Sequence, residues 1–443
     1  MSMAPRSSMG RRLATVCAVG ALLAAQAAAA QMQPELEPVM VDADAEPDIA
    51  PALGWRYSGI IGLTLGGQRS SANSIYDVQG SPDKLSWVGA RTNVILRAGQ
   101  PNRFALLFDG QVERLFETDT WDRRVNQFNV AVDLTESLKL RLGKQRVLWG
   151  RGFTYIPTDF VNPPLDPTGL DIAKVGVPAV SLDYVNDYFL LTTLVRRETK
   201  SKVDSLGVKV TSSAISGLDL DAVFYRAPSI GEAVGASFAL DAGQRLHAVL
   251  HGLILSGGVA MHRKSRYPQA VTVSQNSTDY LLPGDIGAEG PYTSWMLAGT
   301  HEFSDRFSVT AEIYRIGDAY SRTEYQHIID CRADRAAPCH GGSAAWLNHL
   351  AYGRNQQRYL TAAANLSAVT EGVRRLTDTL GIELSVLYAP GDNSSLRTLT
   401  FRSNYWDQAE IVWRIILPAG GSRTEFGTVP YRWYSELAVF ISF

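Results

Sequence analysis

Apolar and polar residues alternate over most of the chain beyond residue 54. In the segments 102–116, 217–225 and 378–388, most residues at alternate positions are apolar and most of those between them are polar. Because successive side chains of a strand point to opposite faces, such segments predict strands with one apolar and one polar face. The pattern predicts 18 strands, with 16 as the alternative count, near residues 55–67, 85–98, 102–117, 122–134, 138–150, 177–186, 188–198, 203–213, 217–227, 230–241, 245–256, 292–303, 306–317, 357–367, 377–389, 394–404, 407–417 and 431–443.

The connections between these segments form two classes that alternate along the chain. One class consists mostly of very short turns, such as 99–101 and 304–305. The other class contains the long connections, 68–84, 151–176, 257–291 and 318–356. Short turns on one side and long loops on the other are typical of barrels that span the bacterial outer membrane.

The width of such a sheet decides which of its faces meets water. Eighteen strands enclose a space too wide for side chains to fill, so the polar faces must line an aqueous interior and the apolar faces must contact lipid. Closure also removes the unpaired strand edges that hydrocarbon does not tolerate. The sequence therefore predicts an all-β fold, a transmembrane antiparallel β-barrel over residues 54–443.

The first 53 residues do not follow this pattern. In residues 1–30, arginines without acidic residues precede an apolar run that is too short to span about 30 Å of hydrocarbon, and a run of alanines follows. This arrangement predicts a cleaved signal peptide, with cleavage before Gln31. Residues 31–53 carry acidic residues and prolines but no basic residue, which predicts a disordered acidic leader in the periplasm.

Cysteine usage agrees with an exported protein. Beyond the signal peptide only Cys331 and Cys339 remain, both in one polar stretch, and a disulfide between them is the natural interpretation in an oxidising compartment. A metal site would need more ligands at tighter spacing, so we expect no metal and no other cofactor.

The end of the chain resembles a known signal. Apolar residues alternate through Leu437, Val439 and Ile441 up to the terminal Phe443. This ending resembles the C-terminal assembly signal of Gram-negative outer-membrane proteins. The resemblance implies recognition by the barrel-assembly machinery and a location in the outer membrane, in contact with its lipid.

A second, shorter resemblance involves the strand near 138–150. Residues 140–150 read LRLGKQRVLWG and precede the proline-containing pairs Ile156-Pro157 and Asn162-Pro163. This pattern is similar to a strand and loop of alginate-export-like barrels and related porins. It implies a broad barrel with a charged interior.

Charged side chains on the polar faces are the candidate solute-facing residues, because rings of charge set solute preference in pores. They are Arg91, Arg97, Asp109, Glu113, Arg141, Asp219, Asp221, Glu302, Glu312, Glu383, Arg397 and Arg414. Two interpretations remain. The arginines of the early strands could form a ladder that guides an anionic sugar polymer, or opposite charges could pair across strands. Trp149, Tyr184 and Tyr314 are candidate platforms for sugar rings.

The loop 151–176 is the third outward connection and is rich in proline. One interpretation is a constriction element folded into the lumen, stiffened by the prolines. The other is a surface loop packed against its neighbours. The residues that would face solute in the first case are Asp159, Asp166, Asp171 and Lys174.

Several function classes are disfavoured. The chain has no Gly-x-Ser-x-Gly or His-Glu-x-x-His motif. His247 and His251, on one face of a predicted strand, would lie about 13 Å apart, too far to share a metal. We therefore expect no enzyme, and no nucleic-acid partner because basic tracts are missing from the sequence.

Three functions stay open. The first is a passive channel, exporter or porin, for hydrophilic and anionic, polysaccharide-like solutes. The second is an uptake channel for small hydrophobic or aromatic acids, and the third a surface adhesion barrel that transports nothing. Only residues 31–53 lie between the signal peptide and the first strand, too few for a plug, so we expect passage to be passive or driven by a periplasmic partner.

Overall fold

The computed structural model describes most of the chain from residue 54 onward. The described ranges are 54–71, 74, 84–100, 103–116, 120–162, 175–197, 204–268, 270–275, 278–283, 287–332, 355–368, 379–405 and 409–442. The predicted signal peptide and leader lie outside them, as do Asp166, Asp171, Lys174, Cys339 and Phe443. Cys331 lies in a described helix, but its predicted disulfide partner does not, so the disulfide stays a prediction.

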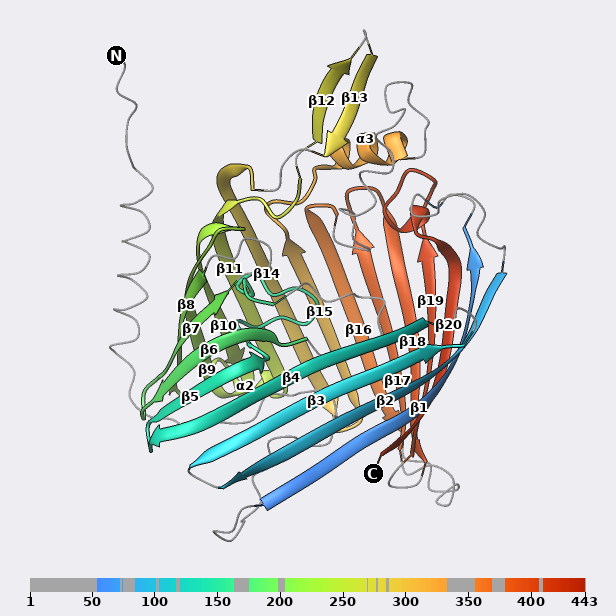
Figure 1. Ribbon diagram of the computed structural model, residues 1–443. Coiled ribbons are helices and arrows are strands. Elements are labelled where there is room, and N and C mark those ends of the chain that lie inside the picture. The colour runs from blue at the N-terminus through green and yellow to red at the C-terminus, as the bar shows by residue number, and fades with distance from the viewer. Residues whose placement is uncertain are drawn as a thin grey trace, which may run out of the picture.

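Eighteen strands of the described chain form one closed antiparallel sheet (Figure 1). They are β1 (Gly54–Ser70), β2 (Lys84–Gln100), β3 (Phe104–Leu115), β4 (Thr120–Thr135), β5 (Leu138–Gln145), β6 (Val177–Val185), β7 (Leu190–Arg197), β8 (Asp204–Ile215), β9 (Leu218–Ala227), β10 (Gly231–Asp241), β11 (Leu253–Lys264), β14 (Glu289–Ser304), β15 (Phe307–Arg315), β16 (Arg358–Ala368), β17 (Thr379–Ala389), β18 (Ser394–Tyr405), β19 (Ala409–Ala419) and β20 (Tyr431–Ser442). The first strand pairs with the last, from Ile60 opposite Ser442 to Ser70 opposite Tyr431, and this closes the barrel. The predicted fold class and the count of 18 are confirmed.

The long connections gather at one end of the barrel, which we call the outer end. There the hairpin of β12 (Ala270–Gln275) and β13 (Thr278–Pro283) and the helix α3 (Arg322–Arg332) project beyond the sheet (Figure 1). The short 3-10 helix η4 (Phe426–Thr428) precedes β20 at the same end. In the described residues, no helix is both long enough and apolar enough to cross a membrane.

Two strands differ clearly from their predicted positions. The strand expected near 138–150 is β5, which already ends at Gln145. The strand expected near 245–256 is β11, which begins at Leu253, after the short helices α2 (Ala242–Arg245) and η1 (Ala248–Leu250). The side chain of Asp241 accepts a hydrogen bond from the amide of Gln244 at 3.0 Å and so caps α2. His247 and His251 therefore lie in this connection and not on a strand face.

The apolar face of the sheet is exposed and the polar face is buried, the reverse of a water-soluble protein. Large apolar side chains point outward and are exposed, among them Leu63 (59%), Leu297 (52%) and Leu384 (52%). Polar side chains such as Asp109 and Glu312 are buried on the inner face, at 3% exposure each. An apolar outer belt around a polar interior is the arrangement of a transmembrane barrel, since lipid contacts the outer face.

This arrangement predicts that a charge is costly on one face and tolerated on the other. Leu384 lies at the middle of β17 and points outward, so Leu384→Lys should lower the free energy of unfolding by about 2–4 kcal/mol. Asn365, next to the residue that pairs with Leu384, points inward opposite Glu383, so Asn365→Lys should cost far less. Urea unfolding in lipid vesicles measures both, and equal costs would contradict the assignment of the two faces.

Candidate functional site

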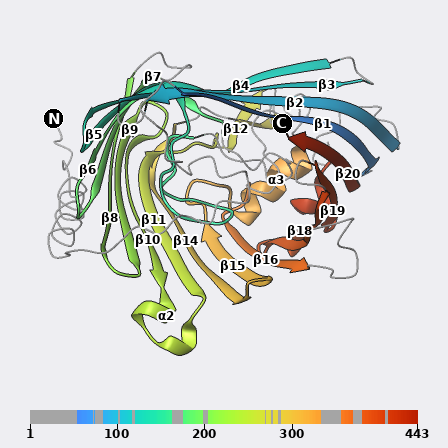
Figure 2. The ribbon, with the colours of Figure 1, turned by 90° about the horizontal axis from the view of Figure 1, so that it is seen from below.

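The segment that follows β5 folds into the barrel and crosses its interior (Figure 2). We call its described part, residues 146–162, the internal loop. The loop turns sharply at Gly150, whose φ of +91° lies in a region that residues with a side chain rarely adopt. The described part of the loop thus lies inside the barrel and not on its surface. Asp159 accepts a hydrogen bond from the amide of Asn162 at 3.2 Å and stabilises the loop itself.

A buried carboxylate on the far wall holds the tip of the internal loop. Glu312 of β15 accepts hydrogen bonds from the backbone amides of Phe153 (2.7 Å), Thr154 (3.1 Å) and Tyr155 (3.0 Å). Hydrogen bonds to an ionised acceptor are about twice as strong as neutral ones. These contacts also satisfy amides that would otherwise be buried without partners.

Ion pairs fix the first half of the loop to the wall formed by β8 and β9. Arg151 lies 3.0 Å from Asp219 and 3.8 Å from Asp221, measured between side-chain nitrogen and oxygen. Lys209 of β8 lies 3.4 Å from Asp221 and donates a hydrogen bond to the carbonyl of Leu148 at 3.2 Å. The two predicted aspartates are therefore anchoring groups for the loop.

Aromatic side chains pack the loop against the same wall. The ring of Trp149 meets that of Tyr225 edge-on at 5.8 Å, and Phe160 stacks on Tyr225 at 6.2 Å. A Cβ atom at Gly207 would lie 2.1 Å from the Trp149 ring, so only glycine allows this contact. At 1% exposure, Trp149 is a packing residue and not a platform for solute.

A stack of three tyrosines continues from the loop toward the outer end. Tyr155 stacks on Tyr314 of β15 with ring centroids 5.0 Å apart, and Tyr314 stacks on Tyr359 of β16 at 5.3 Å. The Tyr359 hydroxyl donates to Glu425 at 2.6 Å, in the connection between β19 and β20. Tyr314 is 1% exposed, so it too is a packing residue.

Glu425 joins the outer loops through a buried polar cluster. Its carboxylate accepts the backbone amide of Asn355 at 2.8 Å, and its own amide donates to Asp392 at 2.7 Å. Asp392 also accepts from the side chain of Gln356 at 2.6 Å. Burial, and secondarily the nearby charge of Asp392, raise the pKa of Glu425 to about 7.

Most of the predicted lumen charges do face the interior, as the register with neighbouring residues shows. The inward set is Arg91, Arg97, Asp109, Glu113, Arg141, Asp219, Asp221, Glu302, Glu312, Glu383 and Arg414. Arg397 is different: it pairs with Leu417, which is 46% exposed on the outward face. Tyr184, at 40% exposure, also points outward, so its prediction as a lumen residue is wrong.

Cross-strand pairing accounts for part of the inward charge. Arg91 lies opposite Glu113, and Arg414 lies opposite Glu436. Arg402 lies 3.1 Å from Glu410. By contrast, Arg141 lies opposite the uncharged residues Ala131 and Ser181.

Several site residues were not singled out in the sequence. Arg146 follows β5 directly and contacts Asp109 at 3.0 Å, while Arg196 of β7 donates to the carbonyl of Val161. Arg151 and Glu425 were missed as well. Their partners are distant in the chain, so the local alternation of apolar and polar residues could not indicate them. The one available signal was Arg151, an arginine that follows Gly150 at the turn of the loop.

The comparisons with known proteins concern the fold. No family model matches the chain, and no curated protein does. Among solved structures, Acinetobacter baumannii OccAB1 is 12% identical with a TM-score of 0.54, and the match covers 87% of this chain and 96% of that one. Pseudomonas aeruginosa OccK11 (OpdR) is 10% identical with a TM-score of 0.51, covering 87% and 95%. Pseudomonas aeruginosa OccK5 (OpdH) is 11% identical with a TM-score of 0.50, covering 87% and 97%.

At these identities the likeness is one of architecture. The chain combines this likeness with a closed 18-strand barrel and an apolar outer belt. It is therefore a porin-like β-barrel of the Gram-negative outer membrane.

Loss of the carboxylate charge on β15 should release the tip of the internal loop. Glu312→Gln weakens the charge-assisted bonds to the loop amides, each worth about 1.5–3 kcal/mol. In a background without Cys331 and Cys339, a water-soluble thiol reagent should label Thr154→Cys about tenfold faster when Glu312→Gln is also present. Glu302→Gln, near the opposite end of the barrel wall, is the control and should leave the labelling rate unchanged. An unchanged rate in Glu312→Gln would show that the carboxylate does not hold the loop.

The outer cluster should weaken as the pH rises. The folded pKa of Glu425, about 7, lies above its ordinary value of 4.5, so the unfolded state ionises first. The folded cluster is therefore most stable below about pH 4.5 and loses about 3 kcal/mol as the pH rises to about 7, above which the loss is complete. The protection factor of the Asn355 amide, which is its exchange rate compared with that of an unfolded amide at the same pH, should fall over this range. Glu425→Gln should remove this fall, and a fall that persists in the variant would contradict the assignment.

Proposed function

We propose that this chain is a passive outer-membrane channel, and not an enzyme, that conducts hydrophilic solutes with a preference for anionic ones. The observation that carries the proposal is the internal loop, which is held inside the barrel by Glu312 and by Arg151. A barrel of 18 strands has an interior too wide for side chains to fill. We propose that this fixed internal segment narrows the interior and leaves a passage beside it, as a selective pore needs.

The route past the loop is supported by where the loop is attached. Its described contacts go to β3, to β7–β11 and to β14–β15, for example through Asp109, Arg196 and Glu312. Toward the outer end, inner side chains of β17 and β19, such as Leu387 and Ile416, share a hydrophobic cluster with Tyr155 of the loop. Nearer the other end of the barrel, the inner faces of β1–β2 and β17–β20 carry charged side chains. We propose that solute passes along this second wall.

The preference for anions rests on arginines of the early strands. Arg91, Arg97 and Arg141 share the inner face, and Arg141 lies opposite the uncharged Ala131 on β4 and Ser181 on β6. Guanidinium groups bind carboxylates in a bidentate manner, so acidic sugar polymers are a suitable solute class. Passive passage permits export or uptake, whichever way the solute gradient runs. For assembly, we propose that the barrel-assembly machinery recognises the strand ending in Phe443.

Removal of these arginines should shift the ionic preference of the channel. In planar bilayers under a KCl gradient, Arg91→Ser/Arg97→Ser/Arg141→Ser should lower the anion-to-cation permeability ratio several-fold, because the positive potential in the lumen falls. Arg397→Ser removes the same charge from the outward face and should leave the ratio unchanged. An unaltered ratio in the triple variant would refute the arginine ladder, and a folded barrel that never passes current would refute the channel.

A further inference from the structure

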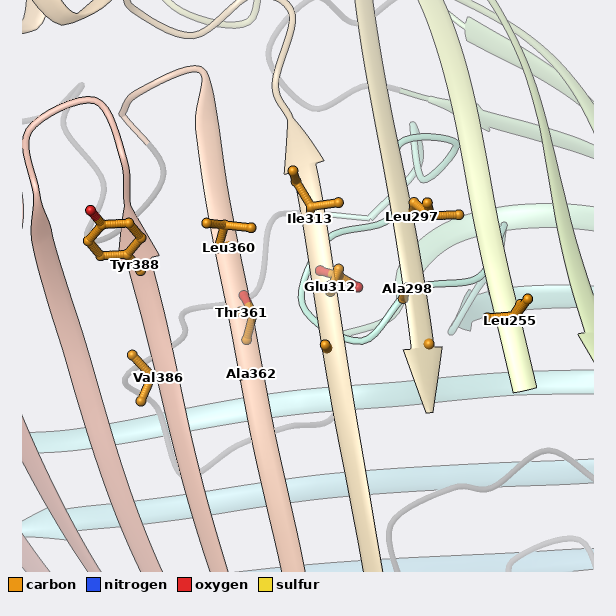
Figure 3. Close-up of a pocket in the computed structure, with 12 residues that line it drawn as sticks. Leu255, Leu297, Ala298, Glu312, Ile313, Leu360, Thr361, Ala362, Val386 and Tyr388 are labelled. Atoms are coloured by element: carbon orange, nitrogen blue, oxygen red, sulfur yellow. The ribbon is translucent and has the colours of Figure 1, made fainter. Parts of the chain in front are cut away.

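The outward face of β14, β15, β16 and β17 carries a shallow apolar hollow (Figure 3). Its floor is a cross-strand row of small residues in direct register, Gly299 opposite Ala311 and Ala311 opposite Ala362. One pair nearer the outer end, larger side chains form a parallel row, Leu297, Ile313 and Leu360. The hollow faces lipid, because Leu297 is 52% and Ile313 41% exposed.

Two arginines lie directly beyond this hollow, at the outer end of the same face. Arg315 is the last residue of β15 and Arg358 the first of β16, and the two are register partners. Residues directly opposite on antiparallel strands have Cβ atoms about 4.5–5.5 Å apart, and like charges in this position are destabilising. On its other side Arg315 pairs with Trp295, a residue type that concentrates at the membrane–water interface.

Within the described chain, neither Arg315 nor Arg358 forms an ion pair with an acidic side chain. The Nε atom of Arg315 is buried and has no hydrogen-bond partner among the described residues. A buried donor without a partner costs about 1–3 kcal/mol, so a ligand oxygen at this position would be stabilising. Two facing guanidinium groups with an open donor suit a phosphate, which accepts several such bonds.

We propose that this face binds a lipid with a phosphate-bearing headgroup from the outer leaflet, with an acyl chain in the hollow and a phosphate on Arg315 and Arg358. The apolar hollow suits the acyl chain of such a lipid. The two arginines lie toward the outer end, where its phosphate would be. Arg397, which also points outward from the first residues of β18, lies two strands from Arg358 and adds to the positive potential.

A second copy of the chain suits this surface less well. The acidic side chains at the outer ends of the described strands that point outward are Asp204, Glu232 and Glu289. Glu232 is 3.4 Å from Arg263, Asp204 lies opposite Arg197 and Glu289 lies opposite Lys264, so all three already face a basic residue. The chain thus offers little negative charge to complement Arg315 and Arg358 in a symmetric contact.

Native mass spectrometry of the full mature protein in neutral detergent tests the proposal. Diphosphorylated lipid A is the probe, its enzymatically dephosphorylated form is the chemical control, and phosphatidylglycerol separates a general anionic lipid from the outer-leaflet one. The wild type should bind diphosphorylated lipid A at least about tenfold more tightly than the dephosphorylated form, as expected for two charge-assisted bonds. Arg315→Gln/Arg358→Gln should lose this difference, and Ala311→Leu, which fills the hollow, should weaken binding of both forms.

Arg123→Gln is the matched control, because Arg123 is an outward arginine at the outer end of β4, opposite Val112 and remote from the hollow. It should bind lipid A as the wild type does. A thermal readout gives a second criterion: Arg315→Gln should raise Tm in neutral detergent, since it relieves the like-charge pair, and should abolish the rise in Tm that lipid A causes in the wild type.

Three results would overturn the proposal. They are equal binding of the phosphorylated and dephosphorylated lipid by the wild type, undiminished binding by the Arg315→Gln/Arg358→Gln variant, and tighter binding of phosphatidylglycerol than of lipid A. A dimer that Ala311→Leu disrupts, without any lipid retained by the wild type, would assign the hollow to a second copy instead.

Discussion

Closure of the sheet on itself is the constraint on which the rest of this structure depends. The pairing of β1 with β20 removes the last open strand edge, so that every spanning strand exchanges backbone hydrogen bonds with two neighbours. In hydrocarbon this is a requirement, because an unpaired amide or carbonyl costs several kcal/mol there. With the backbone satisfied in this way, the side chains need only divide between a lipid face and a water face.

That division leaves a wide interior, and the protein fills part of it with its own chain. A segment inside a barrel brings backbone amides and carbonyls that cannot all bond to one another. Glu312 accepts several of the amides, while Lys209 and Arg196 donate to carbonyls at the other end of the loop. Ionised groups of the wall thus serve as the hydrogen-bond partners of the loop backbone. This explains why charge on the inner face does not translate directly into charge available to solute.

The sequence predicted the strands well, because a period of two depends only on neighbouring residues. It failed where the alternation did not distinguish two structures, as in 245–256, where Asp241 caps a helical turn within an alternating stretch. The internal loop could not be placed, because its principal partner, Glu312, is 159 residues from Phe153. Arg397 was assigned to the wrong face for a related reason. The inward neighbour Leu396 is apolar because it packs into the core beneath the outer loops, which the local pattern does not reveal.

The attachment of the internal loop to one side of the barrel separates two tasks. Residues on β8, β9 and β15 that hold the loop are committed to that role, since Asp221 and Glu312 each bond to more than one group. Inward charges on β2, β17 and β19, such as Arg91, Glu383 and Arg414, lie opposite residues of the neighbouring strands instead. Substitutions there can alter what the interior prefers while the aperture keeps its shape. During evolution, the solute preference of the interior can therefore change through substitutions in one wall, while the other wall keeps the loop in place.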